Sequence, residues 1–426
     1  MNIKKAATYL LLISILLGLS ACKQDTSLLD DYSDVYHFET DYNINMEYSD
    51  AGVSYISESE DGFYFICDLY LYFMDKHTME SIPLCKKADC LHDQETDPYK
   101  KSDCEAFIGG DAVSLFYYDN GIYIATREVV GDKPESYRSQ YYLKKYATDG
   151  TFLENTYSFP ARPKSVIRHR GYMYYTYENN SSSGEGDVVG SYYLSQVSLT
   201  DKSETILYKS TLEQNTLDQM FAYGKRVYCM QYGFDPNVPE NYLAQVVIYN
   251  LESQTYEIMN SMENSVIGVP FILDDSLANN YWFMDYHSPK NKTLYQSDLD
   301  GKNTKPWFTL RYDSSRCHWD GRYFYEDNWP LVVIPRDEPV RKITVYKDFE
   351  PLCEFDFTQV DGIDLSKVAT DHLRISEDSI LVKVEDTENS KYYMICIDKQ
   401  DLEKGSVTPH IIFEKDFDTG GYYTKH

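Results

Sequence analysis

Basic residues are scarce in this sequence. Lys and Arg together number 40 against 68 Asp and Glu, so the formal net charge of the 426-residue chain is −28 at pH 7. Such an excess of carboxylates repels the phosphate backbone of nucleic acids, and we therefore expect no nucleic-acid partner. The acids are spread along the chain instead of forming a terminal block, which is typical of the solvated surface of a folded protein.

The common signatures of catalysis are also missing. The sequence contains no G-x-S-x-G, H-E-x-x-H or G-x-x-x-x-G-K-[ST] motif. The adjacent acids Asp274 and Asp275 lack the D-x-D-x-D-G spacing of a calcium loop. These absences favour a binding or scaffold protein over an enzyme, and no catalytic residue is predicted.

Long apolar runs are absent except near the N-terminus. Lys4 and Lys5 precede an apolar run over 6–19, which is shorter than a membrane-spanning helix and predicts a secretory signal peptide over 1–21. The stretch LSAC, which ends at Cys22, looks like a bacterial lipobox, where the cysteine receives a diacylglycerol; the alternative is an ordinary signal that ends in a chance cysteine. Two acyl chains hold a protein stably at a membrane. The mature protein is therefore expected at the cell membrane, lipid-anchored and facing outside the cytoplasm.

An internal repeat fills most of the chain. Tyrosine contributes 42 residues, and aromatic side chains favour strands. An aromatic strand that follows a tight turn recurs seven times, at residues 61–67, 120–126, 170–177, 224–232, 279–286, 320–327 and 377–384. A short apolar strand precedes each copy, and two further strands follow it around a polar turn such as Asp149-Gly150 or Asp300-Gly301. Four strands in each unit of about 40 to 58 residues predict the blade of a β-propeller.

The repeat therefore predicts an all-β fold. We expect a single β-propeller over 50–415 with seven four-stranded blades, and six or eight blades are the alternatives. An acidic tether over 22–49 would precede it, and a tail over 416–426 would follow. Two insertions interrupt the rhythm, one over 85–110 after the first blade and a proline-rich one over 327–340 inside the sixth. Long loops on a rigid scaffold are a common place for binding function.

The cysteines fall into two groups. Cys67, Cys229 and Cys396 lie in strands among aromatic residues, Cys317 and Cys353 are similar, and in such places cysteine acts as a small apolar side chain. The first insertion instead brings soft ligands into a polar loop with no apolar residues to pack against. These ligands are Cys85, Cys90, His92 and Cys104.

Three interpretations of this Cys/His group are open. Three thiolates and an imidazole suit one tetrahedral structural zinc ion, although the C-x4-C-x-H spacing departs from the common C-x2-C knuckle. The alternatives are one disulfide, Cys85–Cys104 or Cys90–Cys104, with a spare thiol, or free thiols alone. No other cofactor is expected.

Polar and aromatic residues also collect at the ends of two innermost strands, near the place where the central channel of a propeller opens. They are Arg168, His169, Arg170, Arg316, His318 and Trp319. They are candidates for a ligand site at the channel mouth, where propellers often bind small molecules. The alternative is that they are hydrogen-bonded strand ends without a ligand.

The lipobox, the acidic tether and the tyrosine-rich blades with Asp-Gly turns resemble the TolB-like propeller lipoproteins of Gram-positive anaerobes. That group includes a domain of unknown function named for its likeness to the propeller of the low-density lipoprotein receptor. The first insertion is also similar to one in that group, through the Cys/His residues above and the later Ala106 and Phe107. The resemblance implies the fold and the location of the protein, and it implies no established activity.

The first function hypothesis is a membrane-anchored, extracytoplasmic binding or scaffold module for a protein, peptide or glycan. An extracytoplasmic hydrolase or lyase with its site at the channel mouth is the alternative, which would need paired carboxylates or a His/Tyr pair there. The membrane is the partner that Cys22 predicts, and the chain is expected to act as a monomer.

Overall fold

The computed structural model is nearly all β. It describes residues 31–42, 47–49, 55–95, 97–109, 112–130, 138–180, 190–261, 265–283, 292–312, 316–327, 342–366, 368–405 and 407–417. Within these ranges, no helix has both the length and the apolar character that a membrane crossing requires. The expected signal peptide, Cys22 and almost all of the proline-rich insertion lie outside the described residues.

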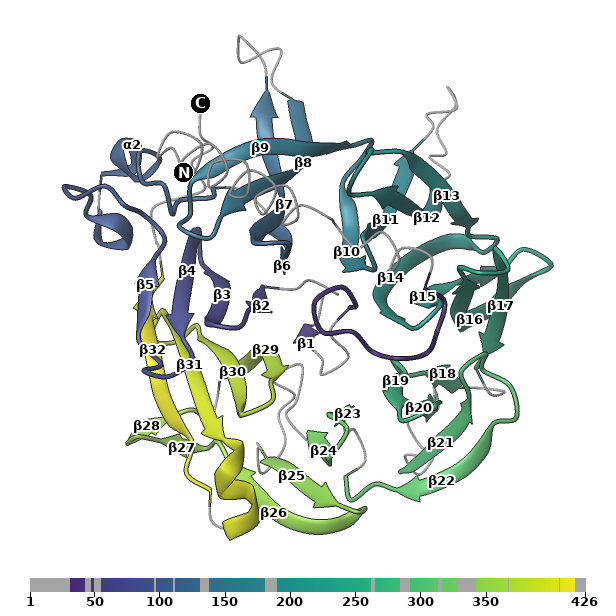
Figure 1. Cartoon of the computed structure of the whole chain (residues 1–426). Coiled ribbons are helices and arrows are strands. Elements are labelled where there is room, and N and C mark those ends of the chain that lie inside the picture. Colours follow the sequence, from purple (N-terminus) through teal and green to yellow (C-terminus); the bar gives the residue numbers. More distant parts are fainter. Residues whose placement is uncertain are drawn as a thin grey trace, which may run out of the picture.

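The described residues form seven antiparallel sheets arranged in a ring, which confirms the predicted seven-bladed propeller (Figure 1). In each blade four strands follow one another from the centre of the ring to its edge. Blades 1 to 4 consist of β2(Ile56–Glu58), β3(Gly62–Cys67), β4(Tyr70–Asp75), β5(Ser81–Pro83); β6(Ala112–Tyr118), β7(Gly121–Val130), β8(Arg138–Ala147), β9(Phe152–Phe159); β10(Pro163–His169), β11(Tyr172–Asn180), β12(Gly190–Ser198), β13(Glu204–Lys209); and β14(Glu213–Tyr223), β15(Arg226–Asp235), β16(Val238–Asn250), β17(Thr255–Asn260).

The remaining blades follow the same order with small additions. Blade 5 has a divided inner edge, in which two short strands both pair with β20. Blades 5 to 7 consist of β18(Ser265–Ile267), β19(Phe271–Leu273), β20(Ser276–Phe283), β21(Thr293–Asp298), β22(Lys305–Thr309); β23(Arg316–Trp319), β24(Tyr323–Asp327), β25(Lys342–Lys347), β26(Glu350–Asp356); and β29(Ala369–Ile375), β30(Ser379–Asp386), β31(Lys391–Asp398), β32(His410–Asp416).

Strands from the two ends of the chain meet in blade 7. The short strand β1(Glu47–Ser49) pairs antiparallel with β29 and adds a fifth strand to the inner edge of that blade. Blade 7 also packs against blade 1, because Leu381, Met394 and Cys396 join the same buried cluster as Phe65 and Tyr72. The ring therefore closes through side-chain packing between its first and last blades, together with the pairing of β1.

Tight turns set the strand register. Between β8 and β9, Gly150 has a φ of +84°, and a Cβ atom at this position would lie 2.3 Å from the carbonyl oxygen of Leu84. The preceding Asp149 accepts a hydrogen bond of 2.9 Å from the backbone N–H of Thr151. The Asp-Gly chemistry predicted for this hairpin is thus needed both for the backbone conformation and for the close approach of the first insertion.

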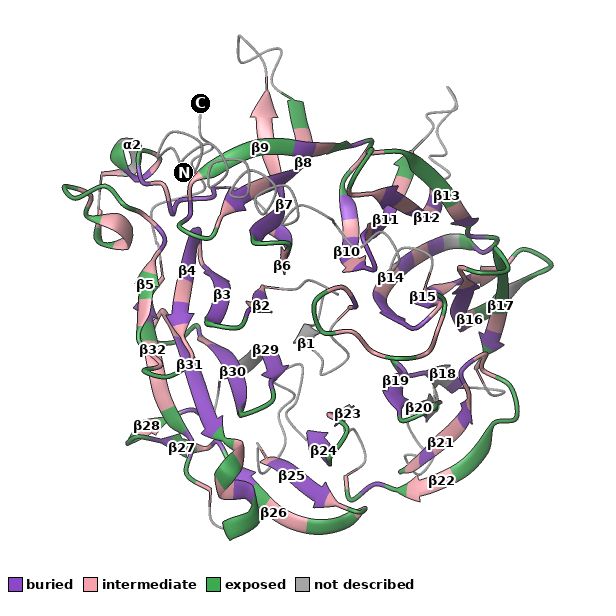
Figure 2. Cartoon of the chain, viewed as in Figure 1, coloured by how far each residue is buried: buried purple, intermediate pink, exposed green. Residues whose placement is uncertain are grey.

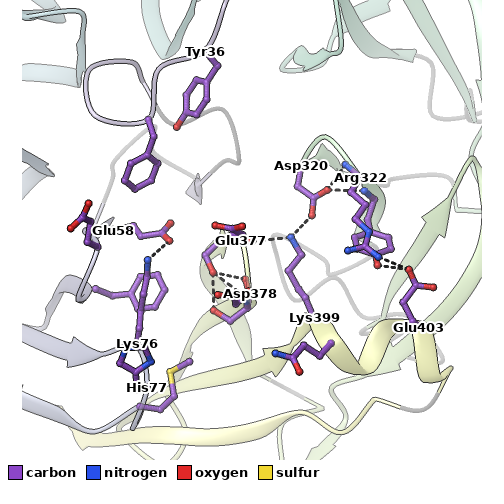
Figure 3. A pocket seen from close by; sticks show the side chains of 18 residues that line it. Tyr36, Glu58, Lys76, His77, Asp320, Arg322, Glu377, Asp378, Lys399 and Glu403 are labelled. Carbon is purple, nitrogen blue, oxygen red and sulfur yellow. Dashed lines mark hydrogen bonds and ion pairs between the residues drawn. The ribbon is translucent and has the colours of Figure 1, made fainter.

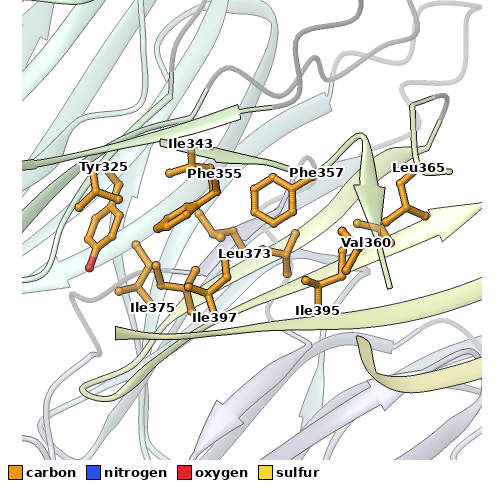
Figure 4. Packing of buried hydrophobic residues seen from close by; sticks show 14 of the residues in the cluster. Tyr325, Ile343, Phe355, Phe357, Val360, Leu365, Leu373, Ile375, Ile395 and Ile397 are labelled. Carbon is orange, nitrogen blue, oxygen red and sulfur yellow. The ribbon is translucent and has the colours of Figure 1, made fainter. Parts of the chain in front are cut away.

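The hydrophobic core lies mainly between neighbouring blades. Figure 2 shows buried residues concentrated on the inner strands of the ring, with exposed residues toward its outer edge. Between blades 6 and 7, Phe355 packs in one cluster with Leu373 and Ile395, and the hairpin of β27(Gln359–Val360) and β28(Ile363–Asp364) covers it (Figure 4). Each such side chain stabilises the fold by about 1.5–3 kcal/mol when fully buried.

Candidate functional site

One face of the ring is crossed by a stretch of the chain that precedes the first strand. Residues 31–42, the N-terminal segment below, run across the central opening beside blades 3, 4 and 5 (Figure 1). Several of the channel-mouth residues predicted from the sequence contact this segment. The N-terminal segment therefore determines what a ligand could reach from this side.

Arg170 forms the strongest link to the N-terminal segment. It lies in the turn between β10 and β11, and its Nε atom is 3.0 Å from Oδ1 of Asp41. The two side chains are 4% and 1% exposed. The guanidinium also donates to the carbonyl oxygens of Val35, at 2.9 Å, and Asp31. A buried charge that lost this pairing would be costly, so the contact fixes the segment in place.

His169 holds the end of the same segment. Its Nδ1 accepts a hydrogen bond of 3.0 Å from the backbone N–H of Tyr42, and its Nε2 lies 2.7 Å from the carbonyl oxygen of Gly224, to which it donates. Burial lowers the pKa of His169 to about 4, so the imidazole is neutral at pH 7. The neutral ring is the form that can accept on one nitrogen and donate on the other.

Further polar contacts complete the docking of the N-terminal segment. Arg168 donates to the carbonyl oxygen of Glu39 at 2.8 Å and lies over the ring of Tyr118. In blade 4, Arg226 pairs with Asp34 at 2.9 Å. Three of the six predicted channel-mouth residues, Arg168, His169 and Arg170, thus bind a part of their own chain.

The other three predicted residues lie on β23 in blade 6. The side chain of Arg316 is outside the described part of the structure. His318 is buried, and Trp319 stacks on Phe349 with ring centroids 5.6 Å apart. None of the five described candidates lines the cavity described next.

A cavity of about 990 Å³ opens on the same face of the ring, beside the N-terminal segment (Figure 3). Blades 1, 6 and 7 form its walls through the turns between their two inner strands, and blades 1 and 7 also through the connections between their two outer strands. Tyr36 and Phe38 of the N-terminal segment complete the lining. Burial raises the pKa of Tyr36 to about 12, so its hydroxyl keeps its proton.

Every Lys and Arg that lines the cavity is paired with a carboxylate. Lys76 lies 2.8 Å from Glu58, and Arg322 lies 2.8 Å from Glu403 (Figure 3). Lys399 pairs with Asp320, whose carboxylate also accepts hydrogen bonds from the backbone of the turn between β23 and β24. Hydrogen bonds from Lys347 and Tyr323 lower the pKa of Glu403 to about 2, so this carboxylate is ionised over the physiological range.

Three exposed acids at the cavity, Glu60, Glu377 and Asp378, form no ion pair with a described residue. They lie in two matching turns with the sequence Ser-Glu-Asp, over 59–61 in blade 1 and 376–378 in blade 7. In both turns the serine Oγ donates a hydrogen bond of 3.0 Å to the carbonyl oxygen of the residue three positions later. The cavity was not predicted from the sequence. The tripeptide repeated at equivalent positions of two blades is the pattern that could have indicated it.

The first insertion brings its four predicted ligands together. One donor atom from each of Cys85, Cys90, His92 and Cys104 lies within 4.8 Å of all the others, and this cluster could hold a metal ion. Cys85 follows β5, His92 begins a short 3-10 helix over His92–Gln94, and Cys104 follows the turn of helix α2(Pro98–Lys101). The thiol of Cys104 is buried, and the other three residues are partly exposed.

The thiols of this cluster are in different environments. Burial favours a higher pKa for Cys85, but hydrogen bonds from the backbone at Lys87 and Glu105 and from the neighbouring thiols lower its pKa below the usual range. Burial and the contact with Cys90 raise the pKa of Cys104. All eight cysteines in the described ranges are free thiols, so the disulfide alternative is not present in this structure.

The cysteines predicted to be apolar are buried or partly buried in the blades. Cys67, Cys229 and Cys396 are 1%, 1% and 9% exposed, and each belongs to a hydrophobic cluster between blades. Burial raises the pKa of Cys229 well above its usual value, which makes this thiol unreactive. Among the described cysteines, those of the first insertion alone have an arrangement suited to metal binding.

Comparison with known proteins identifies the fold only. No protein-family profile matches the chain, and no curated protein matches it in sequence. Among solved structures, oligogalacturonate lyase from Vibrio parahaemolyticus is similar with a TM-score of 0.50 and 10% identity, over 92% of this chain and 94% of the lyase. A prolyl endopeptidase is similar with a TM-score of 0.49 and 11% identity, over 97% of this chain and 55% of that one. At these identities the likeness shows a β-propeller and does not assign an activity.

Proposed function

We propose that the protein is a lipid-anchored, extracytoplasmic binding module whose ligand binds in the cavity between blades 1, 6 and 7 and the N-terminal segment. The observation that carries this proposal is the cavity itself, which has about 990 Å³ of space bounded by three blades and the N-terminal segment. Its volume lies at the upper end of the range of ligand pockets, and its polar groups converge from separate blades. A rigid ring that presents turns from several blades at one place is suited to recognition.

The lining favours a protein or peptide ligand with basic side chains. Among the described residues, six carboxylates line the cavity against three Lys and Arg residues, and each of these cations is already paired. The unpaired acids Glu60, Glu377 and Asp378 could accept ammonium or guanidinium groups. The exposed aromatic ring of Phe38 provides a face on which such cations bind favourably.

The position of the N-terminal segment supports a site near the membrane. Asp31, the first residue of the N-terminal segment as defined above, is nine positions after Cys22, with eight residues between them. A chain of that length spans at most about 32 Å. If Cys22 carries the lipid, the face with the cavity lies close to the bilayer, and its ligand is a membrane-proximal protein or a peptide that diffuses along the membrane.

The alternative, a hydrolase or lyase, receives less support from the lining. One solved structure with a similar fold is an oligogalacturonate lyase. Oligogalacturonate is an anion, however, and the excess of carboxylates in this cavity would repel it. The cavity does contain His77 and Tyr323, so a turnover assay belongs in the test.

The binding proposal is tested with titrations of basic, acidic and neutral peptides, measured by calorimetry. We expect the basic peptides to bind and the variant E377Q/D378N to bind them at least about tenfold more weakly, since two charge-assisted contacts are lost. The matched control is D348N/E350Q, which removes two exposed acids from the edge of blade 6, outside the cavity. Equal binding by both variants would refute the cavity site, and turnover of an oligosaccharide would favour the enzyme alternative.

The anchor is tested separately, by metabolic labelling of the full chain with an alkyne fatty acid in a bacterial host. We expect label and membrane association in the unaltered protein and neither in Cys22→Ala. Label retained in Cys22→Ala would refute the anchor and leave the binding result unaffected.

A further inference from the structure

We propose that Cys85, Cys90, His92 and Cys104 form a closed structural zinc site that fastens the first insertion to blade 1. The proposal is independent of the cavity and of the membrane anchor. It rests on the donor atoms of these four residues, which all lie within 4.8 Å of one another although the residues are separated by up to 19 positions in the sequence.

The insertion has almost no hydrophobic core of its own. Between Cys85 and Cys104, the only buried residue among those whose side chains are described is Lys101, and the apolar Leu91 is 59% exposed. A polar loop of this length pays a large entropy cost for order unless something cross-links it. The convergent thiols and imidazole occupy the place where a core would otherwise be.

The contacts inside the cluster are those of ligands arranged around a common centre. The Sγ of Cys104 is 3.9 Å from Nδ1 of His92, and the backbone N–H of His92 donates to Sγ of Cys90 at 3.3 Å. In a tetrahedral zinc site with Zn–S bonds of about 2.3 Å, thiolate sulfurs are about 3.8 Å apart. The four side chains therefore need to move by no more than about 1 Å to reach that geometry.

The types of ligand identify the ion. Three thiolates and one imidazole are soft or borderline ligands, which zinc prefers and which calcium and magnesium do not. Asp93, which follows His92 in the sequence, has another role, because it accepts a hydrogen bond of 2.7 Å from the hydroxyl of Tyr72. Four protein ligands fill the coordination shell of zinc and leave no position for substrate, so the site is structural and not catalytic.

The ion would close the insertion at its base. Cys85 lies two residues after the end of the outer strand of blade 1, and Cys104 lies two residues before the stretch 106–108, which returns to the same blade. There the backbone N–H of Ile108 donates to Leu69 at 2.9 Å, and that of Leu71 donates to Ala106 at 2.8 Å. Zinc would thus hold the residues between Cys85 and Cys104 as a rigid projection at the edge of the ring, and the blades would fold without it.

The test is elemental analysis of the full chain purified under reducing conditions. We expect about one zinc per chain, and cobalt substitution should produce the strong ultraviolet charge-transfer bands of thiolate ligands. Cys90→Ser should lose the metal, and the matched control Cys353→Ser, which alters a partly exposed cysteine in blade 6, should keep it. His92→Ala, with its imidazole removed, should bind zinc more weakly and alter the cobalt spectrum.

Limited proteolysis distinguishes a local loosening of the first insertion from misfolding of the whole protein. With a chelator, trypsin should cut the unaltered protein faster at Lys86, Lys87 and Lys100, while the blades remain resistant. Zinc far below one equivalent, equal zinc in Cys90→Ser, or a Cys85–Cys104 disulfide in protein purified without reductant would overturn the proposal.

Discussion

Two stretches outside the blades, the N-terminal segment and the first insertion, are both polar, yet they are held in different ways. The N-terminal segment is fixed by partners that the blades supply, above all the buried pair of Arg170 and Asp41. The first insertion makes few side-chain polar contacts with the blades; its last residues, Ala106 and Phe107, join the buried cluster of blade 1, and the rest of it converges on its own thiols and imidazole. One stretch therefore depends on the finished ring, whereas the other carries its means of cross-linking within itself.

Because the two stretches are held in different ways, we expect different changes to release each of them. Changes to the blades should release the N-terminal segment and uncover the cavity, and changes in the redox state or the metal supply should release the first insertion. Each should respond without the other, because the two lie at different parts of the ring, one across its centre and one at its edge (Figure 1).

The largest effect is expected when the buried pair is broken. Asp41→Ala leaves the guanidinium of Arg170 buried without its carboxylate, which should weaken docking of the N-terminal segment by about 3 kcal/mol. Hydrogen exchange at the backbone N–H of Asp41 and Tyr42 should then be faster by about two orders of magnitude. The matched control is Asp34→Ala, since Asp34 pairs with Arg226 but its side chain is 35% exposed, and a smaller change is expected. Unchanged exchange in Asp41→Ala would show that the segment is held in some other way.

A smaller effect is expected from acid. The pKa of His169 is lowered to about 4 from an ordinary value of 6.5, so the unfolded chain binds more protons than the folded one between these values. The stability due to neutral His169 is complete above pH 6.5 and is lost as pH falls toward 4. At pH 5 the loss should be about 2 kcal/mol.

The measurement for this pH effect is urea unfolding of the protein and of His169→Gln, which keeps a donor and an acceptor but binds no proton. The comparison is needed because burial raises the pKa of Asp218 to about 6, which changes stability in the opposite direction in both proteins. Parallel pH profiles for the two proteins would contradict the predicted role of His169.

The smallest effect is expected from the contact between the first insertion and blade 2. The Nζ atom of Lys86 donates a hydrogen bond of 2.7 Å to the hydroxyl of Thr151 and lies 3.5 Å from the carboxylate of Asp149. The side chains of Lys86 and Asp149 are, however, both 57% exposed. Exposed pairs of this kind contribute little to stability. Lys86→Ala should therefore leave the unfolding midpoint and the zinc content unchanged within error, and a clear loss of either would show that the blades hold the insertion after all.

Much of the fold could be read from the sequence because the signal is repeated. The alternation of aromatic strands and tight turns recurs in every blade, so an ambiguity in one copy is resolved by the others. The two hairpin turns around Gly150 and Gly301 require positive φ, and glycine indicates this locally. The Cys/His group could be predicted for a similar reason, since its ligands are close in sequence and lie in a mainly polar loop.

The contacts across the central face could not be predicted in the same way. Arg170 and Asp41 are 129 residues apart, and nothing local indicates that they meet. The cavity likewise combines residues from the first, sixth and seventh blades, which become neighbours only when the ring closes. Their arrangement depends on blade number and on closure, which are properties of the whole ring.

The sequence by itself thus determined the β-propeller, with six to eight blades, and the set of four residues that converge in the first insertion, because both depend on local patterns. Only the tertiary structure decided that Arg168, His169 and Arg170 bind the N-terminal segment, and that Glu60, Glu377 and Asp378 border one cavity. The physical reason is that a buried ion pair and a cavity each require partners from distant parts of the chain, and these partners meet only after the blades have packed against one another.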